Sequence, residues 1–338
     1  MINHANQPSK DLLGLAVLDA ELQILADVVV DLTSVIRGAQ DFRLFALGTT
    51  IANNKQIYIS SNDMLIPLWI IPDNTPKELT KLPVMFEGGL DAWVASSRLD
   101  VLCSPCAKMR SCGKNFQFFE SNNKLWSEVW PSSPHLIRSI SSPCERKKEP
   151  TFSFSTGNAP AASFRNKEVD AFAGFEGKNP RRRAKGPPWL TRGRGSACCL
   201  PVKHPQTGEA LSMGISHSKT LGTHGMQANH YLSQLYAFSN EPPFALVAES
   251  GYFCLPFPSM EEHVIQTVNI SRWRVLSLGN GFIYPDCPRI HFISGMVFDA
   301  DDEDKVIISF GVNDCYSRFV QVSLSGLLDL LFNGVDTT

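Results

Sequence analysis

The sequence predicts an all-β protein. Short runs of β-branched and aromatic residues recur along most of the 338-residue chain, and Gly, Pro, Asn and Asp separate them. This alternation of strand-forming runs and turn residues is typical of short strands joined by loops. Helical periodicity is sustained only over residues 324–332, where we expect a terminal helical turn. Many short strands indicate a sandwich, a barrel or a propeller, and no internal repeat selects among them.

The expected strands follow one another along the chain, each rich in residues that suit a pleated surface. The first third of the chain is expected to form strands at 12–18, 26–32, 42–47, 56–60, 64–71, 82–86 and 92–96. The middle is expected to form strands at 115–119, 124–130, 136–140, 196–202 and 211–216. The last part is expected to form strands at 231–238, 244–248, 291–298, 306–310 and 319–324.

Two segments interrupt this pattern. Residues 141–167 are rich in Ser, Pro, Lys and Asn, which predicts a loop. Residues 176–194 carry seven basic side chains among Gly and Pro, and these are Lys178, Arg181, Arg182, Arg183, Lys185, Arg192 and Arg194. Such a run suits a nuclear signal or an anion-binding patch, but a solvated connecting loop is the favoured interpretation. We therefore expect residues 1–338 to form one domain with two long loops.

Composition and charge narrow the class of partner. Lys and Arg number 31 against 33 Asp and Glu, which leaves a net charge of -2. No overall field attracts the chain to nucleic acid or to an anionic membrane. The apolar stretch at 12–18 is interrupted by Asp19 and is far shorter than the roughly 20 residues of a membrane span. We therefore expect a small or neutral molecule as the partner, and neither nucleic acid nor a membrane span.

The sequence signals leave the cellular compartment of the protein open. No secretory leader is evident, yet the first strand-like run starts so early that an upstream leader or strand is expected to be missing from this gene model. The sequon Asn269-Ile270-Ser271 is compatible with the secretory pathway.

The nine cysteines allow several chemical roles. They are Cys103, Cys106, Cys112, Cys144, Cys198, Cys199, Cys254, Cys287 and Cys315, an odd number that leaves one thiol free if the others pair. The spacing of Cys103, Cys106 and Cys112 superficially suggests zinc, but the second tight pair of a zinc site is absent. We therefore expect disulfides or buried thiols and no metal.

The stretch Asp41-Phe42-Arg43-Leu44-Phe45 places an acid and a base on one face of an expected strand. A carboxyl group that acts as a general acid must hold a proton near neutral pH. An aspartic acid has an unperturbed pKa of roughly 3.9, which would have to rise for that role, whereas a neighbouring Arg43 lowers it. The alternative interpretation is a structural ion pair between the two residues.

Further motifs follow the Asp41 stretch in a fixed order along the chain. After the Asp41 stretch come Lys114-Asn115-Phe116 with Pro134-His135-Leu136, Arg194-Gly195-Ser196 with His217, His230-Tyr231 with 243–247, and 291–298 with Gly311 and Asp314. Over residues 12–330 this collinear set resembles the inverting five-bladed β-propellers of glycoside hydrolase family 130. That family contains mannoside phosphorylases, hydrolases and related mannosyltransferases. The chain departs from the family where Asp-Pro-Arg is replaced by Asp41-Phe42-Arg43.

The resemblance implies a fold, an activity and a set of site residues. The implied fold is a five-bladed β-propeller with an incomplete N-terminal blade. The implied activity is cleavage or phosphorolysis of a mannoside-like bond without a cofactor, with Asp41 as general acid acting through a sugar hydroxyl. An oligosaccharide and inorganic phosphate are the implied ligands. The implied binding residues are Arg43, Lys114, Asn115, Arg194, His217, His230, Tyr231 and Asp314.

Other readings of the site stay open. Hydrolysis needs a second carboxylate, for which Asp314 is the first candidate and Glu87 and Asp91 are weaker ones. A single histidine such as His217 is more often structural than catalytic. Trp189 lies in the polar loop and is the tryptophan best placed to stack on a sugar. A glycosyltransferase using the same site, or a glycan-binding propeller without turnover, would carry the same motifs.

Overall fold

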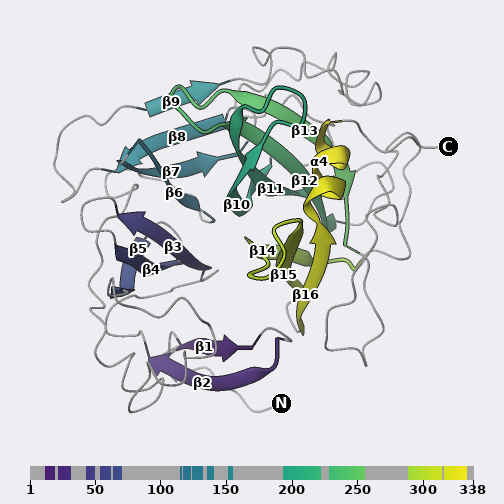
Figure 1. The fold of residues 1–338 in the computed structure, drawn as a ribbon. Coiled ribbons are helices and arrows are strands. Elements are labelled where there is room, and N and C mark those ends of the chain that lie inside the picture. The colour runs from purple at the N-terminus through teal and green to yellow at the C-terminus, as the bar shows by residue number, and fades with distance from the viewer. Residues whose placement is uncertain are drawn as a thin grey trace. The chain divides into compact units, whose positions relative to one another are not determined.

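The computed structural model of the chain describes a set of residue ranges in detail. It describes residues 12–19, 22–31, 43–49, 54–61, 64–70, 115, 117–122, 124–131, 135–140, 151–154, 193–221, 228–255, 288–313 and 316–332. These residues form five antiparallel sheets and one helix, so the all-β prediction is confirmed (Figure 1). The chain divides into two compact units, residues 1–114 with 140–147 and residues 115–139 with 148–338.

The first unit contains two small sheets. Strands β1 (Leu12–Leu18) and β2 (Ile24–Asp31) pair as a hairpin, and β3 (Arg43–Thr49), β4 (Asn54–Ser61) and β5 (Met64–Ile70) form a three-stranded meander.

The described residues of the second unit lie mainly in three sheets and one helix. The first sheet contains β6 (Gln117–Ser121), β7 (Lys124–Trp130), β8 (His135–Ile140) and β9 (Thr151–Phe154). The second contains β10 (Arg194–Lys203), β11 (Ala210–Leu221), β12 (Ala228–Ser239) and β13 (Leu246–Phe253). The third contains β14 (His291–Phe298), β15 (Lys305–Val312) and β16 (Tyr316–Ser323), followed by α4 (Leu324–Phe332). Within each sheet, the strands therefore pair in their order along the sequence.

The expected and observed elements differ in two instructive places. Strand β9 lies inside the segment 141–167 for which a loop was predicted, so that prediction is wrong over Thr151–Phe154. Strand β11 runs to Leu221, beyond the expected end at 216, because its polar residues 216–219 remain paired with β12. The expected strands at 82–86 and 92–96 lie outside the described residues.

Two apolar clusters hold the second unit together. The larger lies between the β10–β13 and β14–β16 sheets and α4, whose leucines Leu327, Leu330 and Leu331 are buried on one side of the helix. The smaller joins Phe119, Trp126 and Ile137 to aromatic residues of β12 and the turn after it, namely Tyr236, Phe238 and Phe244. Within the described part of the chain, no helix is long and apolar enough to cross a membrane.

Ser196 links three sheets at their first strands. Its carbonyl oxygen accepts a hydrogen bond of 3.0 Å from Gln117 Nε2 on β6, and its hydroxyl donates to the Ile293 carbonyl on β14. Gly195 pairs with Ser216 but Ala197 pairs with Ile215, so Ser196 is the extra residue of a β-bulge. A bulge turns the local backbone, which allows one residue to bond to both neighbouring sheets.

The approach of β10 to the preceding sheet leaves no room for a side chain at Gly195. A Cβ there would lie 2.4 Å from the Asn115 carbonyl oxygen, far inside van der Waals contact. We expect Gly195→Ala to lower the free energy of unfolding by about 1–3 kcal/mol, because one backbone segment must move away from the other. Chemical denaturation measures this change.

Gly311→Ala is the matched control. A Cβ at Gly311 would meet the Tyr316 carbonyl oxygen at 4.0 Å, an ordinary contact. Removal of a strand glycine there should leave stability unchanged or raise it by up to about 1 kcal/mol. Equal losses in both variants would contradict the tight approach at Gly195.

Candidate functional site

Strand register gathers several of the predicted binding residues at one end of the β10–β13 sheet. Arg194, the first residue of β10, pairs with His217 on β11. Lys219, two residues further along β11, pairs with Tyr231 on β12. Paired residues of an antiparallel sheet share a face, as do residues two apart on one strand. The four side chains therefore lie on one face of the sheet.

Ring contacts connect this group to the next sheet. The imidazole of His217 stacks on the Tyr231 ring with centroids 5.5 Å apart and planes at 15°. The same imidazole meets Phe292 of β14 edge to face at 5.1 Å. Lys219 Nζ lies 4.4 Å from the Tyr231 ring centroid, within the range of a cation–π interaction. Tyr231 is therefore held by two neighbours on β11, and only 2% of the surface of His217 is exposed.

Two further histidines lie beside this group. The His230 amide donates to Thr220 Oγ1 at 2.9 Å, and the Tyr231 amide donates to the Arg289 carbonyl at 2.9 Å. His291, the first residue of β14, has its Nε2 3.1 Å from Ser233 Oγ. We name this set the basic–aromatic cluster, and its members are Arg194, His217, Lys219, His230, Tyr231, Arg289 and His291.

Burial disfavours the charged imidazolium forms of His230 and His291. Desolvation lowers the pKa of His230, and the positive charge of Arg289 lowers it further. Desolvation lowers the pKa of His291 from 6.5 to about 4, and the nearby His230 adds to the shift. The arginine and lysine side chains of the cluster are Arg194 and Arg289, which are exposed, and the half-buried Lys219. His230 and His291 supply neutral donors and acceptors.

Of the other predicted site residues, the structure describes Asn115 and Arg43. Asn115 is buried with a left-handed backbone of φ 73°, and its carbonyl faces Gly195, one residue from Arg194. Arg43 belongs to the first compact unit, and its side chain is 5% exposed. Outside the described residues lie Asp41, Glu87, Asp91, Lys114, Trp189 and Asp314, together with the sequon and Cys103, Cys106, Cys112 and Cys144.

The sequence analysis missed several members of the cluster. Lys219 could have been found from its spacing, because it follows His217 by two residues and so shares its face. Arg289 and His291 had no such signal, because the contact of β14 with β12 cannot be read from the sequence. In the strands and turns that the structure describes, no group of three or more His, Cys, Asp or Glu side chains is placed to hold a metal ion.

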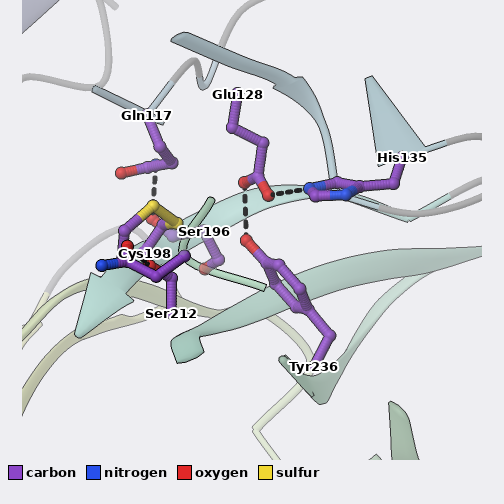
Figure 2. The surroundings of a disulfide bond; sticks show 9 residues. Gln117, Glu128, His135, Ser196, Cys198, Ser212 and Tyr236 are labelled. Atoms are coloured by element: carbon purple, nitrogen blue, oxygen red, sulfur yellow. Dashed lines mark hydrogen bonds and ion pairs between the residues drawn. A yellow bond between two sulfur atoms is a disulfide. The ribbon is translucent and has the colours of Figure 1, made fainter. Parts of the chain in front are cut away.

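A second polar group, the Glu128 network, is enclosed between two sheets (Figure 2). Glu128 on β7 has its Oε1 2.9 Å from His135 Nε2 on β8, and its Oε2 accepts a hydrogen bond of 2.5 Å from the Tyr236 hydroxyl on β12. His135 Nδ1 lies 3.2 Å from the Phe244 carbonyl. All three side chains are at most 1% exposed, so the Glu128 network joins two sheets and is closed to ligands.

The protons of the Glu128 network can be counted from its acceptors. The Phe244 carbonyl can only accept, so His135 Nδ1 must carry a proton. The contact between Nε2 and Glu128 Oε1 then needs one more proton, carried either by the imidazole or by the carboxyl group. In both forms the pair shares a single proton, and Tyr236 donates to the other carboxyl oxygen.

Comparison of the chain with protein-family models, with curated proteins and with solved structures finds no match in any of the three.

The Glu128 network should tolerate an amide better than a hydrocarbon. In Glu128→Gln the amide oxygen can accept from Tyr236 and the amide nitrogen can donate to a neutral His135, so we expect a loss of about 1 kcal/mol in the free energy of unfolding. In Glu128→Leu both partners lose their bonds, and we expect a loss of about 3–5 kcal/mol. Denaturant titration of both variants measures the difference, and equal losses would contradict this bonding scheme.

The lowered pKa of His291 predicts pH-dependent stability. Because the folded state resists protonation until about pH 4 while the unfolded side chain binds a proton near 6.5, stability falls as pH falls through this window. The expected contribution is about 3 kcal/mol, present above pH 6.5 and lost by pH 4. Unfolding of wild type and His291→Gln across this range should show a shallower pH dependence in the variant. Identical profiles would contradict the prediction.

Proposed function

We propose that the protein is a carbohydrate-active enzyme that cleaves or phosphorolyses a mannoside-like glycosidic bond. Asp41 serves as the general acid, and the basic–aromatic cluster holds sugar hydroxyls and inorganic phosphate. One observation supports this assignment above others. Arg194 with His217, and Tyr231, were expected to bind ligand from two motifs, and the register of β10, β11 and β12 brings the three residues together.

The chemistry of the cluster fits such a ligand. Arginine and lysine bind phosphate through charge-assisted hydrogen bonds. Aromatic faces such as that of Tyr231 suit the apolar C–H groups of a sugar ring. The proposal therefore assigns phosphate to the exposed cations Arg194 and Arg289 with Lys219, and sugar to the aromatic and imidazole side.

The proposed fold for this activity is a five-bladed β-propeller. Five successive antiparallel sheets, each made from strands adjacent in sequence, support it because a propeller blade is such a meander. The role of Asp41 rests on its sequence motif alone.

Purified protein offered mannose-containing oligosaccharides, with and without phosphate, tests the activity. A phosphorylase should release sugar 1-phosphate only when phosphate is present, and a hydrolase should release free sugar without it. Asp41→Asn should lower turnover by about 10²–10⁴-fold while binding is kept, because a general acid contributes that much to rate. Unchanged turnover in this variant would refute the role of Asp41. Saturable binding without product would instead support a glycan-binding protein.

Arg194→Gln tests the phosphate assignment. Loss of a charge-assisted hydrogen bond should weaken phosphate binding by roughly 10–100-fold in calorimetry. Lys203→Gln is the matched control, since Lys203 is an exposed cation at the opposite end of the same strand. It should bind phosphate like the wild type, and equal weakening in both variants would show only a general charge effect.

A further inference from the structure

Strand β10 contains a pair of adjacent cysteines joined to each other. Cys198 and Cys199 form a disulfide bond (Figure 2). Both side chains are partly exposed, so a dissolved thiol reagent can reach them. The proposed function makes no use of this pair.

The pair occupies a second bulge of β10. Ala197 pairs with Ile215 and Leu200 pairs with Met213, so the two cysteines oppose the single residue Gly214. Gly214 in turn pairs with Tyr236 on its other side. The cysteine pair is therefore one strand away from the tyrosine that bonds to Glu128.

Gly214 has no space for adjustment. A Cβ at this position would lie 2.4 Å from Tyr236 Cζ and from its hydroxyl oxygen, so the tyrosine ring lies against the glycine backbone. We therefore expect a displacement of β11 opposite the bulge to press on the Tyr236 ring. The hydroxyl of Tyr236 ends on Glu128 in the adjacent sheet.

The sulfur atoms also border the core that joins the two sheets. Cys198 and Cys199 pack against the smaller apolar cluster, which includes Phe119 and Trp126 of the β6–β9 sheet. On the other side of the pair, Ser196 carries the bonds to Gln117 and Ile293. Oxidation or reduction of the cysteine pair should therefore affect the contact between the β6–β9 and β10–β13 sheets.

We propose that Cys198 and Cys199 form a reversible redox modification site whose state controls how firmly these two sheets are joined. The reductant is a dithiol of the kind found in small molecules or protein oxidoreductases. One of its thiolates attacks Cys198 or Cys199, the bond between the two cysteine sulfurs breaks, and a mixed disulfide forms. The second thiol of the reductant then displaces the remaining cysteine. Two electrons and two protons pass to the protein, and the reductant leaves as a disulfide.

Reduction changes the space that the pair occupies. Two thiol sulfurs that are no longer bonded must separate to van der Waals contact, and in a closely packed interior such a change displaces neighbouring groups. The neighbours here are the aromatic side chains of the apolar cluster and, through Gly214, the Tyr236 ring. Reduction should therefore loosen the β6–β7 hairpin from β10 without unfolding the β10–β13 sheet.

The test uses the full chain under native conditions. Protein incubated with glutathione disulfide, and then with increasing dithiothreitol, is alkylated with iodoacetamide and mapped by mass spectrometry. The peptide holding both cysteines should be unlabelled after oxidation and doubly labelled after mild reduction, and removal of the reductant should reverse this. Free thiols after oxidation, or labelling that appears only in denaturant, would overturn the proposal.

Hydrogen exchange tests the coupling between the sheets. Reduction should speed amide exchange in β6 and β7 by roughly tenfold or more, while β11 and β12 exchange as before. The variant Cys198→Ala/Cys199→Ala controls for reduction of other cysteines, because its exchange should not respond to dithiothreitol. If this variant does not fold, Cys199→Ser serves the same purpose, since one remaining thiol cannot form the bond. Reduction without any change in exchange at β6 and β7 would refute control of the contact.

Discussion

A carboxyl group shut away from water is tolerated only when hydrogen-bond partners surround it, and Glu128 obtains its partners from two different sheets. His135 approaches from the next strand of the same sheet, and Tyr236 approaches from β12 of the neighbouring one. The need to surround Glu128 with hydrogen-bond partners also determines contacts elsewhere in the β10–β13 sheet. Tyr236 reaches Glu128 by lying against Gly214, so the register of β11 with β12 must place a glycine there. The bulge of β10 at Cys198 and Cys199 faces the same glycine.

The same junction positions the basic–aromatic cluster. Ser196, which bonds to β6 and β14, lies two residues from Arg194, so the start of β10 is held from both sides. The bond between Ser233 and His291 ties β12 to β14 close to the stacked rings of His217 and Tyr231. The cluster therefore rests on strands anchored by buried bonds. Such anchoring is what a binding site needs if its groups are to be held in place before the ligand arrives.

The sequence predicted strands well where apolar residues alternate and poorly where burial is polar. Strand β9 escaped notice because four residues, Thr151–Phe154, stand among Pro, Ser and Lys. The end of β11 escaped notice because His217, Ser218 and Thr220 look like solvent-exposed residues, although the fold buries them. Within the cluster, motifs identified Arg194, His217, His230 and Tyr231, whereas Arg289 and His291 depend on contact between separate sheets. The bond from Tyr236 to Glu128 joins residues 108 positions apart, which no local pattern reveals.

The cluster combines two kinds of chemistry, which the proposed function assigns to one ligand. Its buried side holds His230 and His291, which burial keeps neutral at physiological pH, and the hydroxyl of Ser233. Neutral donors and acceptors suit hydroxyl groups, because they bond to them without stranding a charge in the interior. Its outer side holds Arg194 and Arg289, which keep their charge in water and suit an anion. A ligand that is rich in hydroxyls at one end and anionic at the other matches this division, as a sugar beside a phosphate would.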